Sequence, residues 1–276
     1  MIGLDTSHTV EFTDIFQDDQ GDPHLASVDI VAAVPAGSEL PLSRQRVAKF
    51  TAEMQTKGVT IVDDIQELLP LVDAVMLESV DGSVHLEQAI PVIKTGKPLF
   101  IDKPLASSFA DAKRIVDWIT DHRVPCFSSS CIRFSRPLQA AKQDSRIGKI
   151  CGAATWGPCH YQDDGTGLFF YGLHGIEGLF ALMGPGFQSV QRVQTKETDV
   201  LVGTWKDGRI GTYRGLRTGM TEFGATVFGS KATSSFQLGV PYRELCIEIA
   251  KFFLTGIAPV ELEETLEILR FMEQVQ

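Results

Sequence analysis

Residues 74–127 carry the stretch AVMLESVDGSVHLEQAIPVIKTGKPLFIDKPLASSFADAKRIVDWITDHRVPCF, in which short apolar runs alternate with longer stretches of helical rhythm. The apolar runs are Ala74–Leu77, Pro98–Ile101 and Val124–Phe127, and the helical stretches are His85–Thr95 and Phe109–His122. Strands that alternate with helices of this length predict βαβ units and hence a parallel sheet. Because such crossovers are almost always right-handed, we expect the sheet to be doubly wound.

The same alternation runs back to the first residue. Expected strands are Met1–Leu4, Ser27–Val34 and Val59–Val62, and expected helices are Thr6–Phe16, Leu42–Lys57 and Ile65–Leu69. Ser27–Val34 is apolar and β-branched, as a strand buried on both faces should be. Met1–Leu4 is shorter than the usual strand of about five or six residues. This short start leaves open whether residues precede Met1 in the natural protein.

After about Cys131 the rhythm changes to short strands joined by polar turns. The expected strands are Lys149–Trp156, Ser189–Gln194, Asp199–Trp205, Arg209–Arg214, Thr226–Gly229 and Ala232–Leu238, and the expected helices are Tyr171–Met183, Tyr242–Leu254 and Leu262 to the end. This order predicts an α+β domain with an open, mostly antiparallel sheet. The chain thus divides into a Rossmann-type dinucleotide-binding domain, residues 1–131, and a substrate and oligomerisation domain, residues 132–276. An open sheet with one uncovered face needs a partner, so we expect a homodimer or homotetramer formed through the second domain.

The composition is that of an ordinary globular protein, with 43% hydrophobic and 22% charged residues among 276. A net charge of −10 argues against a protein that tracks nucleic-acid phosphates. No apolar stretch approaches the roughly 18 residues of a membrane span, and no signal peptide is visible, so we expect a cytoplasmic protein without a membrane partner. The five cysteines match no common zinc spacing, and we expect reduced thiols and no metal site.

The turn GLDTSH joins the first expected strand to the first helix. A dinucleotide site carries three glycines here, so that the backbone can approach a pyrophosphate at the helix N-terminus. Gly3 keeps the first glycine position, whereas Asp5 and His8 occupy the other two. Thr6 and Ser7 could cap the helix and donate hydroxyl groups to a phosphate. A plain helix cap, with Asp5 accepting from backbone amides, explains the same residues equally well.

Lys103 follows a buried strand in the segment Phe100–Pro104 (FIDKP). A lysine at the carboxyl end of a central parallel strand faces the crevice in which α/β sheets hold their ligands, although a solvated strand end is the alternative. The end of the second strand, Val34-Pro35-Ala36, carries no acid to accept from a ribose, so NADP is as compatible with the sequence as NAD.

The segment GLHGIE opens the long helix of the second half and holds His174 and Glu177 three residues apart. At this spacing a carboxylate can orient or charge an imidazole, which is the usual acid–base group near neutral pH. A structural histidine on an amphipathic helix is the alternative. Nearby aromatic residues, which include His160, Tyr161 and Tyr171, could stack on a sugar ring or a nicotinamide, or could form a core.

Taken together, these segments resemble the glucose–fructose oxidoreductase/inositol dehydrogenase (Gfo/Idh/MocA) family along essentially the whole chain. FIDKPLA at Phe100–Ala106 is similar to the EKP motif of that family, with Asp102 in place of the glutamate, and Arg133-Phe134 follows as in the family. The stretch Ser79–Ile90 resembles the family's strand-end loop, with His85 opening the next helix. The helix at His174 is similar to the DxGxHxxD segment, with Phe170 at the first acid position and Glu177 at the last.

The resemblance implies a nicotinamide-dependent oxidoreductase that acts on a sugar, cyclitol or related polyol. Lys103 would hydrogen-bond the substrate hydroxyl, His174 would take its proton, and Glu177 would support His174. The implied cofactor residues for NAD or NADP are Gly3, Asp5, Thr6, Ser7, His8, Ser79, His85, Asp102 and Lys103, and the implied substrate residues are Lys103, His160, Tyr161, Tyr171 and His174. The altered glycine turn leaves a second interpretation, a relative that binds a sugar-like ligand without redox chemistry.

Overall fold

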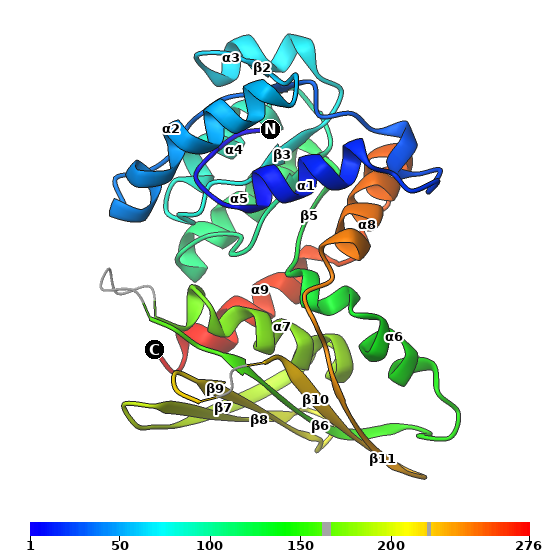
Figure 1. Ribbon diagram of the computed structural model, residues 1–276. Helices are drawn as coiled ribbons and strands as arrows, with labels where there is room; N and C mark the ends of the chain where they lie inside the picture. The colour runs from blue at the N-terminus through cyan, green and yellow to red at the C-terminus, as the bar shows by residue number, and fades with distance from the viewer. Residues whose placement is uncertain (162–166, 220–221) are drawn as a thin grey trace. The chain divides into compact units, whose positions relative to one another are not determined.

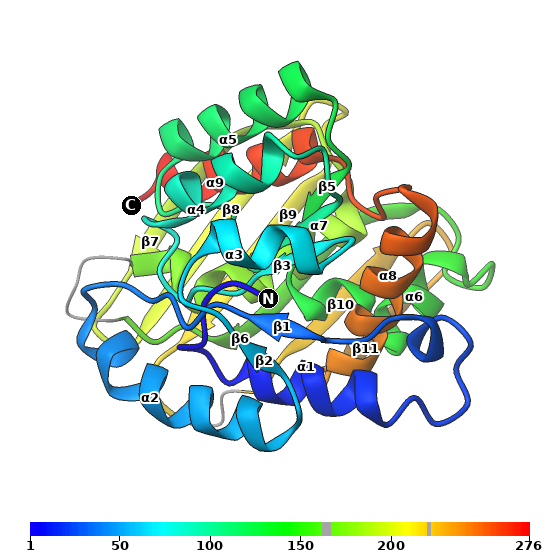
Figure 2. The same ribbon diagram turned by 90° about the horizontal axis from the view of Figure 1, so that it is seen from above.

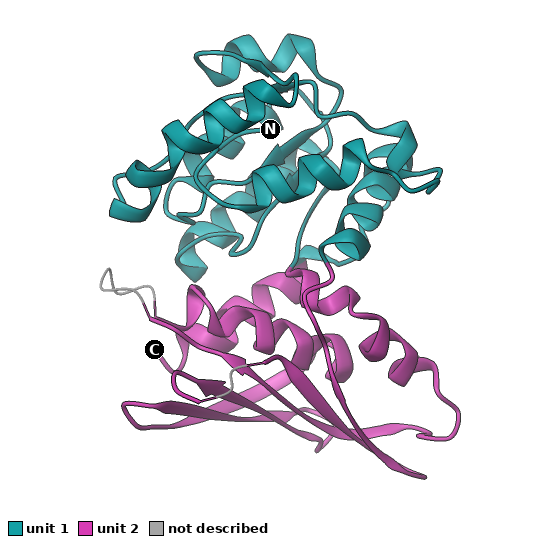
Figure 3. Cartoon of the chain, in the orientation of Figure 1, with its two compact units in different colours: residues 1–129, 242–262 teal, residues 130–241, 263–276 magenta. Residues whose placement is uncertain are grey.

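The structure is a computed structural model that describes residues 1–161, 167–219 and 222–276. The chain forms two compact units (Figure 3). Unit 1 contains Met1–Ser129 and Tyr242–Leu262, and unit 2 contains Ser130–Pro241 and Glu263–Gln276.

Unit 1 is built on short parallel strands with helices between them (Figure 1). Its strands are β1 (Ala32–Ala33), β2 (Thr60–Ile61), β3 (Val75–Leu77), β4 (Leu99–Ile101) and β5 (Cys126–Ser128). Its helices are α1 (His8–Gln17), α2 (Pro41–Thr56), α3 (Ile65–Leu68), α4 (His85–Ile93), α5 (Phe109–His122) and α8 (Tyr242–Thr255), with short 3₁₀ turns at Leu25–Ser27 and Leu69–Leu71.

Ile2 joins the strands of unit 1 into one parallel arrangement. It makes parallel bridges to Val34, which follows β1, and to Leu77 of β3. The order across the unit is therefore β2, β1, Ile2, β3, β4, β5. Helices α1 and α2 lie on one side of these strands, and α4 and α5 lie on the other (Figure 2). The predicted doubly wound parallel sheet is confirmed.

The helices of unit 1 begin and end where local side chains satisfy the backbone. In α5, the Ser108 hydroxyl accepts from the Asp111 amide at 3.1 Å, and Arg123 ends the helix in the left-handed conformation. Its buried face is an apolar stripe of Ala112, Ile115, Val116 and Ile119. This regular pattern explains why the predicted bounds of this helix, Phe109–His122, agree with the structure.

Unit 2 is a six-stranded sheet with helices against one face. Its strands are β6 (Ile150–Pro158), β7 (Phe187–Gln194), β8 (Thr198–Trp205), β9 (Ile210–Leu216), β10 (Gly224–Gly229) and β11 (Thr233–Gln237), and its helices are α6 (Arg136–Gln143), α7 (Gly172–Met183) and α9 (Leu262–Glu273), with 3₁₀ turns at Cys131–Phe134 and Gly167–Phe169. The sheet order is β11-β10-β6-β9-β8-β7, in which only β6 and β9 pair in parallel. The predicted open, mostly antiparallel sheet is confirmed.

The two faces of this sheet differ sharply in burial. Helix α7 packs on β6, β9 and β10, and residues facing it, such as Leu201 and Tyr213, are fully buried. Pairing register places Phe228 and Ile210 in one row across the opposite face, and both are about half exposed. Val193 of β7 is also exposed on that opposite face.

Two features of the fold differ from the sequence expectation. Helix α8 belongs to unit 1, where Phe252 contacts Phe127 of β5, so the second unit is interrupted between Pro241 and Glu263. Strand β1 pairs only over Ala32–Ala33 instead of Ser27–Val34, because its partner β2 has just two paired residues. Among the described residues, no helix has the length and apolar character required to cross a membrane.

Candidate functional site

Most of the predicted cofactor residues of unit 1 gather at the carboxyl ends of its parallel strands. The turn that contains Gly3 and His8 follows Ile2, Ser79 follows β3 after one residue, and Asp102 and Lys103 follow β4. Ligands of open α/β sheets bind beyond this edge, so these residues form the candidate site of unit 1.

Gly3 has a structural reason to be glycine. Its φ is +87°, and a Cβ at this position would lie 2.3 Å from Ser79 Oγ and 2.5 Å from the Ser79 amide nitrogen. Ser79 Oγ donates to Gln88 at 2.7 Å, and the Ser79 carbonyl lies 2.7 Å from His85 Nε2. The first glycine of the turn therefore permits close packing of two strand ends, which the side chains of Ser79 and His85 help to fix.

Asp5 turns its carboxylate toward the neighbouring strand end. Its Oδ1 accepts from the Val80 amide at 2.9 Å, and the residue is fully buried. Burial raises the pKa of this carboxyl, and the hydrogen bonds it accepts oppose that effect. Asp5 thus satisfies a backbone amide of the loop after β3 and not one of α1, which differs from the plain helix cap expected as the alternative.

His8 forms a buried pair with Asp102. The His8 Nδ1 atom lies 2.7 Å from Asp102 Oδ2, and its ring stacks on Phe12 and meets Tyr242 edge-on. Thr6 Oγ1 accepts from the His8 amide at 3.4 Å, whereas Ser7 is exposed and makes no side-chain capping bond. The third glycine position of the turn is thus occupied by a side chain bound to the end of β4.

Glu78 lies beside this pair, and sequence reasoning missed it. Leu77 pairs with Ile101 in parallel register, so the next residues, Glu78 and Asp102, are neighbours at the strand ends. Glu78 is fully buried, and among the described residues neither of its carboxylate oxygens has a hydrogen-bond partner; the same holds for Asp102 Oδ1. The signal was present in the sequence as an acid directly after the buried run AVML.

The pKa values of the two acids diverge. Burial, and then the charge of Asp102, raise the pKa of Glu78 well above its ordinary value. Burial alone would also raise the pKa of Asp102, but the charges of His8 and Lys103 and the hydrogen bond from His8 lower it instead. Asp102 therefore keeps its negative charge at the end of β4.

Lys103 is half-buried at the same edge and follows Asp102 directly. Within the described part of the chain, its ammonium group has no hydrogen-bond or salt-bridge partner, in contrast to Lys57, which pairs with Asp14. A buried polar group without a partner loses solvation, so an unpaired ammonium at a ligand-binding edge is a candidate to donate to a bound molecule.

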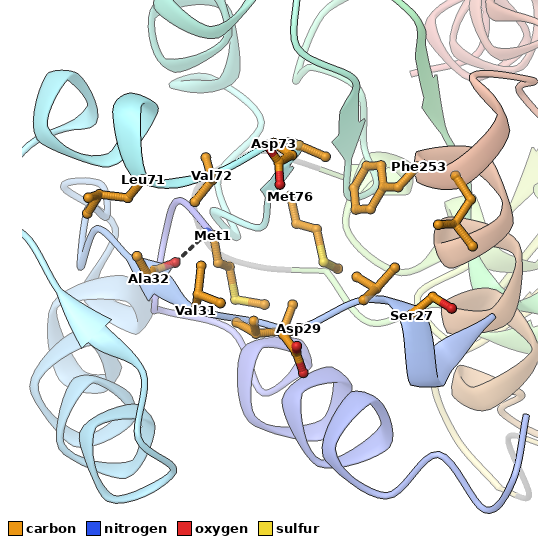
Figure 4. A pocket seen from close by; sticks show the side chains of 14 residues that line it. Met1, Ser27, Asp29, Val31, Ala32, Leu71, Val72, Asp73, Met76 and Phe253 are labelled. Carbon is orange, nitrogen blue, oxygen red and sulfur yellow. Dashed lines mark hydrogen bonds between the residues drawn. The ribbon is translucent and has the colours of Figure 1, made fainter. Parts of the chain in front are cut away.

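A cavity of about 380 Å³ lies at the opposite edge of the sheet (Figure 4). It is lined by residues 27–31 just before β1 and by residues 71–74 just before β3, and Met1, Ala32, Met76, Phe253 and Leu254 complete its wall. These segments enter the strands at their amino ends. The cavity is therefore separate from the strand ends that carry Lys103 and His8.

In unit 2, His174 lies on α7 within an aromatic cluster. The Ser130 hydroxyl is 2.7 Å from His174 Nδ1, and the rings of Tyr171 and Phe223 lie within 5.7 Å of the imidazole. The His160 ring lies 5.6 Å from Tyr171. Three of the predicted substrate residues, His160, Tyr171 and His174, are thus brought together.

Glu177 has an electrostatic partner that its spacing from His174 did not suggest. Arg133 Nε donates to Glu177 at 2.5 Å, and Arg133 Nη2 donates to Glu264 of α9 at 2.6 Å. All three groups are largely buried, and the two carboxylates raise the pKa of Arg133 against the effect of its burial. Every residue of α7 is buried, so Glu177 has its ion pair in the interior of unit 2 and not on a solvent-exposed face of the helix.

Tyr161 joins a second charge cluster of unit 2, centred on Asp199. The fully buried Asp199 carboxylate pairs with Arg192 at 2.8 Å and with Arg217, and it also accepts from the Tyr161 hydroxyl. Arg217 lies over the Tyr161 ring at 4.5 Å. The predicted substrate residue Tyr161 therefore has a structural partner in this network.

Comparison with known sequences identifies related proteins for part of the chain. The model of the oxidoreductase family with an NAD-binding Rossmann fold (GFO_IDH_MocA) matches residues 40–129. An inositol 2-dehydrogenase from Gluconacetobacter diazotrophicus is 38% identical over 72 residues, which span 25% of this chain and 21% of that protein.

Solved structures match over nearly the whole chain. A probable dehydrogenase from Thermotoga maritima is similar with a TM-score of 0.79 and 20% identity over 99% of this chain and 94% of its own. The apo scyllo-inositol dehydrogenase of Lactobacillus casei gives a TM-score of 0.80 and 14% identity over 99% and 93%. At these identities the likeness establishes a shared fold.

Proposed function

We propose, from the premise that residues 40–129 belong to the Gfo/Idh/MocA oxidoreductase family, that this protein is an NAD(P)-dependent oxidoreductase of a sugar, cyclitol or related polyol. The observation that carries the proposal is Lys103, an ammonium group without a partner among the described residues, directly beyond β4. Its position at the carboxyl edge suits a residue that donates to a ligand bound at that edge.

The residues of this edge fit a dinucleotide. Gly3 allows the turn to pack closely, and Asp5 directs one carboxylate oxygen to the Val80 amide, which engages that oxygen within the protein. The cofactor would lie along the turn of Gly3, Thr6 and Ser7, with Ser79, His85 and Asp102 fixing the adjacent strand ends. The sequence supports NAD and NADP alike, because no acid follows β1.

The protein's part in the reaction would be to hold the substrate and to move its proton. When bound, a nicotinamide supplies the hydride acceptor. Lys103 would donate a hydrogen bond to the hydroxyl that is oxidised, and the imidazole of His174 would take the proton. Ser130 would position that imidazole, Arg133 would hold Glu177 in place, and His160 and Tyr171 would contact the substrate ring.

The roles of Lys103 and His174 can be tested with matched variants. Reduction of NAD or NADP is followed with a panel of inositols and sugars as substrates. Lys103→Met and His174→Gln should lower kcat/KM by about 10²-fold or more, since general acid–base groups contribute about 10²–10⁴-fold. Lys97→Met, at the other end of β4, and His122→Gln, exposed on α5, should retain the wild-type value. Equal rates in all four variants would contradict these roles.

A second candidate is a protein that binds a sugar-like ligand without redox chemistry. It is favoured by the buried pair of His8 and Asp102, because His8 fills a glycine position of the usual turn. The two candidates differ in one property. The oxidoreductase binds a nicotinamide dinucleotide. The second candidate does not bind the dinucleotide and binds a polyol without it.

We propose further that two or four copies associate through the sheet of unit 2. Its outer face carries Val193, Ile210 and Phe228, which are 69%, 54% and 45% exposed. Exposed apolar groups grouped on one face mark an association surface. Light scattering at micromolar concentration should give a dimer or tetramer, and Ile210→Lys should shift it toward a monomer. A monomeric wild-type protein would contradict the proposal.

A further inference from the structure

The carboxyl edge of unit 1 contains a buried cluster of His8, Glu78 and Asp102, here called the edge cluster. One ligand-type atom of each residue lies within 4.8 Å of those of the other two. Three separate segments supply the residues: the start of α1 and the ends of β3 and β4. The register of β3 and β4 fixes the two acids side by side, and α1 brings the imidazole to them.

The internal bonds of the edge cluster are incomplete. His8 bonds one oxygen of Asp102, while both oxygens of Glu78 and the second oxygen of Asp102 are buried with no partner in the part of the chain that the structure describes. The Met1 ammonium donates to the Ala32 carbonyl, and Lys103 makes no hydrogen bond within the described chain. An unsatisfied buried carboxylate is costly, so fixed groups of this kind call for a cation or a proton between them.

We propose that the edge cluster binds a divalent transition-metal ion through His8, Glu78 and Asp102. Two carboxylates and one neutral imidazole carry a charge of −2, which one divalent ion balances. A ligand set of one nitrogen and carboxylate oxygens suits zinc or manganese. With metal–ligand distances of about 2.1 Å, tetrahedral ligand atoms lie roughly 3.4 Å apart, which rotations of these side chains can reach.

The ion would cross-link three segments that a ligand bound at this edge would also contact. It would connect the turn after Ile2 with the ends of β3 and β4, and it would leave an open coordination position, as sites with three protein ligands do. This proposal departs from the sequence expectation of no metal site, which rested on the cysteine spacings and considered no site made of carboxylates and histidine. It stands apart from the proposed redox function, because its test measures no turnover.

The test is a titration of chelator-treated protein with Zn²⁺ and with Mn²⁺, followed by calorimetry and by elemental analysis after desalting. The wild-type protein should bind one ion of zinc or manganese per chain, and its melting temperature should rise with metal concentration. Glu78→Gln should weaken binding more than about 100-fold, since even the loss of an outer partner costs 10–100-fold. Glu87→Gln, at an exposed acid of α4 outside the edge cluster, should bind like the wild type.

A wild-type protein that binds neither metal overturns the proposal, as does equal binding by wild type and Glu78→Gln. If Glu78→Gln does not fold, the absorption spectrum of the Co²⁺-loaded wild type shows which type of ligand atom binds the ion. Nitrogen and oxygen ligands give weak visible bands without a thiolate charge-transfer band, as expected. A strong thiolate band would assign the ion to cysteine and overturn the proposal.

Discussion

The edge cluster of unit 1 and the Asp199 cluster of unit 2 both bury charged side chains, yet only one of them is complete. Asp199 is fully buried and has partners on both oxygens, from Arg192, Arg217 and Tyr161. Glu78 is equally buried, and neither of its oxygens has a partner within residues 1–161, 167–219 and 222–276. The hydrogen bonds lower the pKa of Asp199 despite burial, whereas burial raises that of Glu78. The Asp199 cluster thus satisfies its charges internally, as buried polar groups in folded proteins mostly do, whereas the edge cluster does not.

The comparison requires that the carboxyl edge of unit 1 is tightly packed, and a substitution at Gly3 tests this. Gly3→Ala should cost about 3–4 kcal/mol of unfolding free energy, because its Cβ would overlap Ser79 at a positive φ. Gly208, with a φ of +85° but no atom within 4 Å of a Cβ, is the matched control, and Gly208→Ala should cost about 1 kcal/mol. Urea denaturation of both variants measures the difference. Equal costs would mean that the strand ends can move to accommodate a new side chain. The missing hydrogen bonds of the edge cluster would then not indicate a fixed binding site.

The second test removes the charge from the complete cluster. Asp199→Asn should lower the unfolding free energy by about 3 kcal/mol, because it leaves two mostly buried arginines without their ion pair. Asp207→Asn, at an exposed acid paired with Arg209, should change it by less than about 0.5 kcal/mol. Chemical denaturation at neutral pH measures both. A small effect at Asp199 would remove the contrast between the clusters.

The pH dependence of stability should follow Asp199 in a defined direction. Its pKa is lower in the folded than in the unfolded chain, so its contribution is present above the ordinary carboxyl pKa of about 3.9. That contribution is lost as pH falls through the lower, folded value. Unfolding free energies measured from neutral pH down to pH of about 3 should fall less steeply in Asp199→Asn than in the wild type. Parallel curves would contradict this assignment.

The smallest effect is expected at Glu78 in the metal-free protein. Glu78→Gln should change the unfolding free energy by no more than about 1 kcal/mol, because no bond is lost and an amide can donate to Asp102 Oδ1. The measurement is urea denaturation in the presence of a chelator. A loss as large as that of Asp199→Asn would show that Glu78 already has a structural partner.

Local patterns predicted the elements well and their long-range partners poorly. The bounds of helix α5 could be predicted from its helical rhythm, since the cap and the apolar stripe that fix them lie within or beside the segment itself. The length of β1 depends on β2, and the unit to which α8 belongs depends on Phe127; neither is encoded locally. Sequence spacing places Glu177 near His174 but cannot reveal Arg133, which lies 44 residues earlier.

The candidate site shows the same limit. The strand-end positions of Lys103 and Asp102 could be predicted, because parallel strands end at one edge. Tyr161 was expected beside a substrate, but its hydroxyl bonds Asp199, which the sequence separates from it by 38 residues. Glu78 was overlooked because an acid after a strand resembles any solvated strand end until the register with β4 is known.

The most direct test of the proposed function is a calorimetric titration of the wild-type protein with NADH and with NADPH. The account predicts that at least one of the two binds at micromolar strength, with one dinucleotide per chain. Absence of binding to both up to millimolar concentration would contradict it, and would leave the carboxyl edge of unit 1 as a site for a ligand without redox chemistry.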